Sequence, residues 1–412
     1  MSIADFSGRM RPDACPGALQ VHEAADGPLA RVRLPGGAIS TAQLRELAAC
    51  ADWLGSGVIE LTSRANVQVR GLRSPAAFAA RVAAAGLLPS AAHERVRNIV
   101  ASPLSGRGAA GVLDVLALAR ALDRTLCARP ELAALPGRFL FALDDGTGDV
   151  TTLGADVTYT PFPPAGTMTS PPGQPGTGRV LLAGRDTGLV AGPDAAVALM
   201  VAAAGAFLDE RREQAPEDAT AAWRIHELTD GPARITARVS ARLRDRPDEP
   251  QAAPPAPSVP SARAVARRAG RVGQRDGRVA LEVLVPLGRL SAAQARALAG
   301  SGPEVRLTPW RTAVLLDLSP AGADRAERVL TAAGLVTDPA SPWAGVTACT
   351  GRPGCAKALA DVRADARRWV ESLDAAPETP VHWAGCERRC GLPRGPVAEL
   401  IATGDGYRRR QR

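Results

Sequence analysis

The chain has 412 residues, of which 46% are hydrophobic and 22% are charged, and this balance excludes a peptide, a minimal scaffold and a largely disordered protein. The formal net charge is +8, and Lys357 is the only lysine, so nearly all of the positive charge is guanidinium. The arginines are scattered and aromatic residues make only 3%, which disfavours nucleic-acid binding and favours a polyanionic small substrate.

Neither a secretory signal nor a membrane span is predicted. The N-terminal segment lacks an apolar core of signal-peptide length, and the longest apolar run, Ala195 to Leu208, is too short to cross a bilayer. Seven cysteines in a chain of this length are too few and too unevenly placed for a secreted disulfide framework. We therefore expect a cytoplasmic protein that does not contact a membrane.

The first predicted unit is a strand, a turn and a helix. Residues 32–37 (VRLPGG) lead to Ser40, which stands three residues before Gln43, a spacing typical of a capping box. The Ala/Leu/Arg-rich helix that follows should end at Gly55, and a short strand with a Leu-Thr pair occupies residues 60–64.

Polar side chains then alternate with apolar ones, which predicts a strand with one polar face. The polar positions are Arg64, Asn66, Gln68 and Arg70. Taken alone, such a face is most simply a solvated one.

The middle of the chain mixes strands, helices and a long Pro/Gly-rich loop at Pro161 to Gly178. Strands are predicted at Asn98 to Ala101, Arg138 to Leu143 and Val180 to Ala183, and helices at Val112 to Leu126 and Ala195 to Arg211.

A Pro/Ala-rich stretch around residues 247–262 predicts an extended linker, and the first unit then repeats after it. Leu284 to Gly288 lead to Ser291 and Gln294, again spaced as a capping box, and the helix should stop at Gly300. A second Leu-Thr strand follows at 306–310. An internal duplication in an α+β protein is the simplest explanation.

Four cysteines near the C-terminus form two pairs. Cys349 and Cys355 enclose five residues, whereas Cys386 and Cys390 enclose three. Zinc sites generally use tighter knuckles, while iron-sulfur clusters accept wider loops. Glycines around the thiols allow the backbone to fold around a cluster, so we predict a [4Fe-4S] site.

The remaining candidate ligands are isolated. Cys15, Cys50 and Cys127 stand alone and are predicted to be structural thiols. None of the four histidines, His22, His93, His226 and His382, pairs with another at helical spacing, although a mononuclear iron site stays open.

Three motifs together resemble the sirohaem-dependent nitrite and sulfite reductase superfamily. They are the C-x5-C and C-x3-C pairs, the duplicated R-x-R-L-P-G-G and L-T-x-R-x-x-x-Q pattern, and the R-N-x-x-x-S-P segment at 97–103. The likeness runs from about Cys15 to Gly395. In its size, its short linker and its scarcity of lysine, the chain most resembles the cobalamin-pathway members of this superfamily.

The resemblance implies two ferredoxin-like half-domains in pseudo-twofold relation and two mixed α/β domains that bind tetrapyrrole and cluster. The expected boundaries are residues 1–80 for the first half-domain, 81–246 for a reductase-like domain, 247–262 for the linker, 263–335 for the second half-domain and 336–412 for the cluster domain.

The resemblance also implies roles for the arginines. Arg33, Arg64, Asn66, Gln68 and Arg70 would bind tetrapyrrole carboxylates, for which guanidinium forks are well suited. Positions matching Arg31 and Arg97 face the small oxyanion in the reductases, and Arg138 stands in the matching strand, so these three are the catalytic candidates. Trp310 replaces Arg64 in the second copy, so one functional site is expected. The four paired cysteines would hold the cluster, and the one matching Cys390 bridges it to haem iron in the reductases.

The implied activity is an oxygen-dependent monooxygenase that hydroxylates precorrin-3A at C20 and closes a γ-lactone in aerobic cobalamin synthesis. It would use O2 and NADH-derived electrons delivered by a reductase or ferredoxin, since no flavin or nicotinamide domain is visible, and would work beside neighbouring cobalamin-pathway enzymes. The alternative is a small nitrite or sulfite reductase that holds sirohaem, although Leu140 stands where sulfite reductases use a proton-donating lysine. A third possibility is a cluster-bearing tetrapyrrole carrier.

Overall fold

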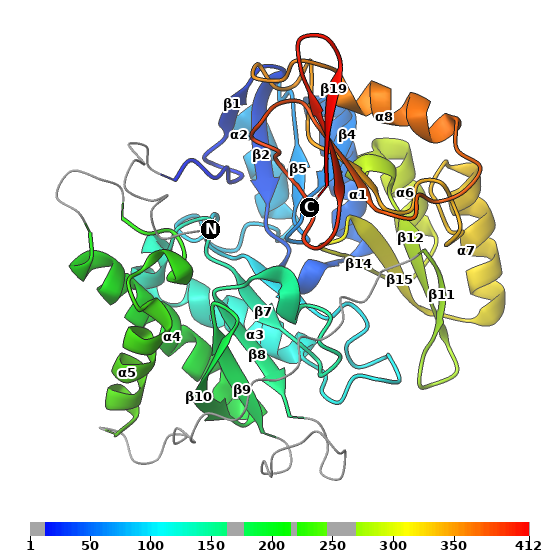
Figure 1. Cartoon of the computed structure of the whole chain (residues 1–412). Helices are drawn as coiled ribbons and strands as arrows, with labels where there is room; N and C mark the ends of the chain where they lie inside the picture. The colour runs from blue at the N-terminus through cyan, green and yellow to red at the C-terminus, as the bar shows by residue number, and fades with distance from the viewer. Residues whose placement is uncertain (1–12, 163–176, 216–220, 245–268, 412) are drawn as a thin grey trace. The chain divides into compact units, whose positions relative to one another are not determined.

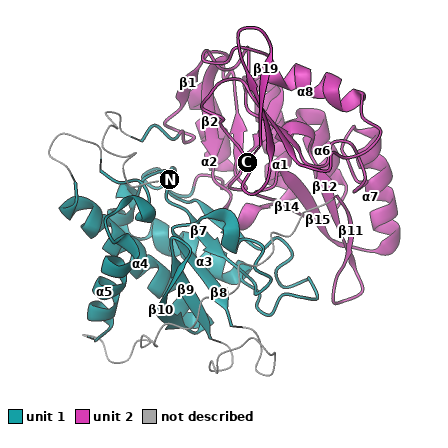
Figure 2. Ribbon diagram, viewed as in Figure 1, with its two compact units in different colours: residues 1–15, 89–265 teal, residues 16–88, 266–412 magenta. Residues whose placement is uncertain are grey.

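The computed structural model describes residues 13–162, 177–215, 221–244 and 269–411 (Figure 1). The chain divides into two compact units (Figure 2). Unit 1 comprises Met1–Cys15 and Pro89–Val265, and unit 2 comprises Pro16–Leu88 and Ala266–Arg412. The predicted linker at 247–262 and most of the predicted loop at 161–178 lie outside the described residues.

Unit 2 contains two copies of one α+β motif. The first copy consists of β1 (His22–Ala24), β2 (Gly27–Val32), β3 (Ala38–Ile39), α1 (Thr41–Leu54), β4 (Val58–Leu61), β5 (Val67–Val69) and α2 (Pro75–Ala84). The second consists of β11 (Gly270–Gly273), β12 (Val279–Leu284), β13 (Arg289–Ser291), α6 (Ala292–Gly300), β14 (Glu304–Leu307), β15 (Thr312–Leu318) and α7 (Pro320–Ala332). The predicted duplication is therefore confirmed.

The two copies exchange an edge strand. The sheets have the orders β1-β2-β5-β4-β13 and β11-β12-β15-β14-β3, so each ends on a strand from the other copy. Helices α1 and α6 pack together, and both copies contribute to a single hydrophobic core. Because each sheet is completed by the other copy, the two half-domains form one folded body with pseudo-twofold symmetry.

The repeat extends to individual turns. In the first copy the Thr62 amide donates to the Asn66 carbonyl at 2.9 Å, and in the second the Thr308 amide donates to the Thr312 carbonyl at 2.9 Å. Each turn holds one residue with positive φ, Ala65 at 57° and Arg311 at 61°. The matching geometry supports the alignment that sets Trp310 against Arg64.

Both predicted capping boxes are present. Ser40 with Gln43, and Ser291 with Gln294, exchange the paired hydrogen bonds that satisfy the first free amides of a helix. Helix α1 ends at Gly55 as predicted, whereas α6 runs through Gly300 and is capped at Ser301.

The C-terminal part of unit 2 is a small mixed layer of sheet and helix. Strands β16 (Val346–Ala348), β17 (Val381–Ala384), β18 (Ala398–Ala402) and β19 (Tyr407–Gln411) pair in sequence order, with the first three parallel and the last antiparallel. Helix α8 (Val362–Glu371) packs against β16 and β17.

Unit 1 is built on a five-stranded mixed sheet. Its order is β10 (Arg185–Ala191), β9 (Gly178–Leu182), β8 (Val157–Pro161), β7 (Phe141–Leu143) and β6 (Ile99–Ala101). Strands β6, β7 and β8 are parallel, whereas the β8–β9 and β9–β10 pairings are antiparallel. The predicted strands at 98–101, 138–143 and 180–183 are thus confirmed in position, with shifted ends.

Two predicted boundaries in unit 1 are wrong. Helix α3 spans Leu116–Cys127 and does not begin at Val112, because the amides of Val112 and Leu113 donate to the Asp145 carbonyl at 2.7 and 3.3 Å. Strand β7 does not begin at Arg138, because the Phe139 amide closes a turn on the Pro136 carbonyl at 2.9 Å.

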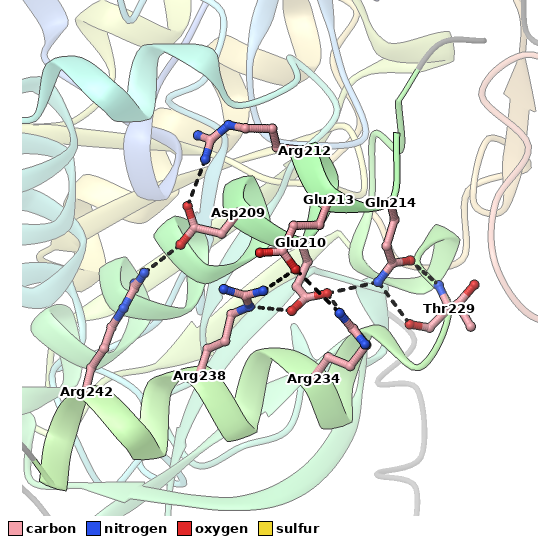
Figure 3. Close-up of polar contacts among 9 residues, drawn as sticks. All are labelled: Asp209, Glu210, Arg212, Glu213, Gln214, Thr229, Arg234, Arg238 and Arg242. Atoms are coloured by element: carbon pink, nitrogen blue, oxygen red, sulfur yellow. Dashed lines mark hydrogen bonds and ion pairs between the residues drawn. The ribbon is translucent and has the colours of Figure 1, made fainter. Parts of the chain in front are cut away.

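Helices α4 (Pro193–Glu213) and α5 (Gly231–Arg244) of unit 1 are joined by ion pairs (Figure 3). Glu210, which is 1% exposed, accepts hydrogen bonds from Arg234, Arg238 and Gln214. Within the described part of the chain, no helix combines the length and apolar character needed to cross a membrane.

Candidate functional site

The two cysteine pairs meet at one edge of the C-terminal sheet. Cys349 directly follows β16, and Cys386 follows β17 after Gly385. These strands are parallel neighbours with Ala348 opposite Trp383, so their carboxyl ends lie side by side. The Cys349 amide donates to the Trp383 carbonyl at 2.9 Å, which fixes the start of the first cysteine loop against the second strand.

Glycines let the cysteine loops fold closely around the sulfurs. The Gly385 amide donates to the Cys349 Sγ at 3.1 Å, the kind of contact that surrounds cluster thiolates in iron-sulfur proteins. A Cβ on Gly385 would lie 2.8 Å from the Ala358 Cβ, so only glycine fits there without a shift. The Cys355 amide closes its own turn on the Gly351 carbonyl at 2.9 Å.

The four thiols interact electrostatically. Loss of hydration, followed by the charges of Cys349, Cys386 and Cys355, raises the pKa of the Cys390 thiol. All four are free cysteines, Cys390 being exposed and the others half-buried. Four free cysteines in neighbouring glycine-rich loops fit the ligand set of a [4Fe-4S] cluster.

One arginine from each half-domain holds a cysteine loop. Arg70, directly after β5, donates to the Gly354 carbonyl at 2.7 Å and makes a two-pronged ion pair with Asp26 at 2.8 and 2.7 Å. Arg311, directly before β15, donates to the Gly391 carbonyl at 3.1 Å. The loops that carry Cys355 and Cys390 are therefore tied to the duplicated core.

A buried carboxylate, Glu60, lies among several arginines of unit 2. Its Oε1 is 2.7 Å from a guanidinium nitrogen of Arg363 and 3.7 Å from Arg289 Nε, and its Oε2 is 3.9 Å from Arg70. Burial, followed by the charge of Arg363, lowers the pKa of Arg289. This cluster was not predicted from the sequence, because strand pairing brings Arg289 to Glu60 and the packing of helix α8 brings Arg363 there, and both depend on the tertiary fold.

The predicted strand with one continuous polar face is wrong in its extent, because β5 spans only Val67–Val69. Arg64 lies in the turn before β5, and Asn66 is 1% exposed with its Oδ1 accepting the Leu34 amide at 2.9 Å. Arg70 is also buried. The alternation arises because Asn66 and Arg70 hold neighbouring loops, not because they face water.

Two other predicted residues of unit 2 lie near this strand. Arg31 Nε donates to Gln68 Oε1 at 2.9 Å across the β2–β5 pairing, and Arg31 is half-buried. Arg33 is 2% exposed and donates to the Pro16 carbonyl at 3.0 Å. Their substrate and catalytic roles stay predictions.

The other two predicted catalytic arginines belong to unit 1. Arg97 is buried and donates two hydrogen bonds, of 2.6 and 2.7 Å, to the Asp123 carboxylate. These bonds connect the segment before β6 to α3. Arg138 is exposed, with its guanidinium carbon 4.7 Å from the centre of the Trp223 ring. Leu140 is 3% exposed in the same unit.

Three of the isolated candidate ligands, Cys50, His93 and His382, are buried. Cys50 is fully buried, and burial raises the pKa of its thiol to about 11. His93 bridges Ser90 at 2.8 Å and the Arg129 carbonyl at 2.9 Å. The His382 Nδ1 bonds the Thr347 hydroxyl at 2.9 Å, and burial lowers the pKa of His382 to about 3.

Comparison with known proteins identifies the repeat. The Nitrite/Sulfite reductase ferredoxin-like half domain matches residues 22–79 and 272–333. The ferredoxin–nitrite reductase of Synechococcus elongatus is 29% identical over 410 residues, covering 92% of this chain and 77% of the relative. The precorrin-3B synthase of Sinorhizobium sp is 26% identical over 408 residues, covering 97% and 82%.

A solved structure shares the fold. The Mycobacterium tuberculosis NirA protein superposes with a TM-score of 0.74 and 22% sequence identity, over 93% of this chain and 73% of that one. The two half-domain matches and this likeness confirm the fold that the sequence predicted.

Proposed function

For a chain built on two nitrite/sulfite reductase ferredoxin-like half domains, we propose precorrin-3B synthase activity in aerobic cobalamin synthesis in the cytoplasm. Precorrin-3A would be hydroxylated at C20, and its ring A acetate would close a γ-lactone. One atom of O2 enters the product and the other leaves as water, which consumes two electrons and two protons. The observation that carries the proposal is the likeness to a precorrin-3B synthase over 97% of the chain.

The four paired cysteines, Cys349, Cys355, Cys386 and Cys390, are the proposed ligands of a [4Fe-4S] cluster. A bound cluster supplies electrons one at a time, and the electrons would come from a reductase or ferredoxin fed by NADH. The hydrogen bond from the Gly385 amide to Cys349 Sγ stabilises negative charge on that sulfur.

The arginines would bind the substrate carboxylates. In this proposal the guanidinium of Arg31, on β2, is oriented by its hydrogen bond to Gln68 and binds one carboxylate. The guanidinium of Arg64, in the turn before β5, binds another. Arg33, Asn66 and Arg70 are buried, so for them we propose a positioning role in which they fix the loops around the site. In unit 1, Arg97 is buried and paired with Asp123 and Arg138 is exposed, and we propose them as further catalytic candidates.

The second candidate is a small sirohaem-dependent nitrite or sulfite reductase. The 29% identity to a nitrite reductase favours it. The buried Leu140 and the single lysine of the chain disfavour it, because proton delivery to a bound oxyanion needs donors that an apolar side chain lacks.

The deciding experiment is an absorption spectrum of anaerobically purified protein with iron and sulfide analysis, followed by two assays. Three results would together support the synthase. The spectrum would show a broad cluster band without haem bands, the protein would contain about four irons per chain, and precorrin-3A would be converted only when O2 and a reductant are both present. Sirohaem bands with nitrite or sulfite consumption would overturn it in favour of a reductase. Binding of precorrin-3A without turnover would point to a carrier.

A further inference from the structure

Unit 1 contains a buried group of three carboxylates that the proposed reaction does not use. Asp144, Asp145 and Asp149 are 0%, 2% and 8% exposed, and their candidate ligand oxygens all lie within 4.8 Å of one another. Burying carboxylates beside one another is costly unless a positive charge compensates them. The sequence DDGTGD at 144–149 carries the group in a short loop after β7.

The loop uses only one oxygen of Asp144. Its Oδ1 accepts the amides of Gly146 and Gly148 at 2.8 and 3.0 Å and the Thr160 hydroxyl at 3.2 Å. Its Oδ2 is buried and has no hydrogen-bond partner. A fully buried carboxylate oxygen without a donor is rare in folded proteins and requires a specific explanation.

The other two carboxylates are oriented in a similar way. Asp145 Oδ1 accepts the Thr147 amide at 3.1 Å and its hydroxyl at 2.7 Å. Asp149 Oδ1 accepts the Ser102 hydroxyl at 2.6 Å, and the same Ser102 oxygen accepts the Asp145 amide at 3.1 Å. Backbone and hydroxyl donors thus hold all three acids in fixed positions.

The group lies where sheets of this kind bind ligands. Ser102 follows β6, the three acids follow β7, and Thr160 lies near the end of β8, so one edge of three parallel strands supplies all of these side chains. The carboxyl ends of parallel strands are the usual binding edge of such a sheet.

We propose that Asp144, Asp145 and Asp149 bind one hard divalent cation of the Ca²⁺ or Mg²⁺ class. The donors are all oxygens and carry up to three negative charges, which suits these ions and gives soft metals no thiolate or imidazole. The cation would accept Asp144 Oδ2 as a ligand and compensate the buried charge.

The test uses the full chain as purified, stripped with chelator and titrated separately with CaCl2 and MgCl2 in a calorimeter, while iron is measured independently. We expect one cation bound per chain and a rise in melting temperature. The two salts distinguish the ions, since Mg²⁺ demands a tighter octahedral set. A wild-type chain that binds neither salt and shows no thermal shift would overturn the proposal.

Asp144→Asn is the informative variant, because its amide oxygen still accepts the loop donors while its NH2 replaces the unpaired oxygen. We expect cation affinity to fall by about tenfold or more. The chelator-treated variant should melt at or above the temperature of the chelated wild type, since one buried charge is gone. Asp194→Asn, an exposed acid of the same unit, should bind as the wild type does. Equal binding by Asp144→Asn and the wild type contradicts the site.

Discussion

Arg70 joins the first half-domain to the first cysteine loop: its guanidinium lies 2.7 Å from the Gly354 carbonyl and is held in place by Asp26. A Cβ on Gly354 would lie 2.9 Å from Asp26 Oδ2, so the loop approaches this pair as closely as glycine allows. The position of Cys355 therefore depends on a side chain almost three hundred residues earlier in the chain.

Replacing Arg70 with Met should reduce the cluster content of the purified protein and its stability together. The loss leaves Asp26 without its ion-pair partner, and because Asp26 is partly exposed the cost should lie between the ~1 kcal/mol of a surface pair and the ~3 kcal/mol or more of a buried one. Iron per chain and urea unfolding measure the two effects. Arg278→Met, which removes an exposed pair with Asp276, is the control and should change neither.

Serine at any of the four paired cysteines should remove cluster absorbance and lower the iron content, because a hydroxyl is a poorer cluster ligand than a thiolate. We expect the loss for Cys349, Cys355, Cys386 and Cys390 alike. Cys127→Ser, a half-buried thiol in unit 1, provides the matched control. Full iron content in Cys386→Ser, with native-like circular dichroism, would be incompatible with the ligand assignment.

Stability should fall in acid through Glu210. Burial alone would raise its pKa, but hydrogen bonds from Arg238, Arg234 and Gln214 outweigh burial and lower the pKa to about 2 (Figure 3). A carboxyl with a lowered folded-state pKa stabilises the protein above its unfolded value of 4.5, and this contribution disappears as the pH falls from 4.5 towards 2. Urea unfolding of wild type and Glu210→Gln between pH 2.5 and 5.5 checks the sign, since the variant should show the shallower slope. Equal slopes would mean that the arginines do not stabilise this charge.

Alanine at Gly37 should destabilise the strand exchange between the half-domains. Gly37 has a φ of +68°, and a Cβ there would lie 1.9 Å from the Leu307 carbonyl oxygen. Leu307 directly precedes the turn at 308–312 in the second half-domain. Backbone cannot move away cheaply, so we expect a loss of ~3 kcal/mol or more. Gly277→Ala, at φ +79° with no atom within 4 Å of its Cβ, isolates the conformational cost of ~1–2 kcal/mol. Similar unfolding free energies for the two variants would show that the close approach does not matter.

Local sequence patterns determined the repeated unit and the pairing of four cysteines in glycine-rich loops. Ser40 with Gln43 and Ser291 with Gln294 form capping boxes because the bonds join residues three apart, which the sequence displays directly. The cysteine spacings likewise identify four donors in glycine-rich loops. These features depend on neighbours along the chain, so they can be predicted without the fold.

Tertiary structure decided which polar residues are buried and what they hold. Asn66 and Arg70 follow the alternation of an exposed face, yet pairing with distant segments buries both of them. The Glu60 cluster and the exchanged strands β3 and β13 arise in the same way. The acids at 144–149 are plain in the sequence, but only their burial and the unpartnered Asp144 Oδ2 distinguish a cation site from an ordinary acidic turn, because burial depends on the whole fold.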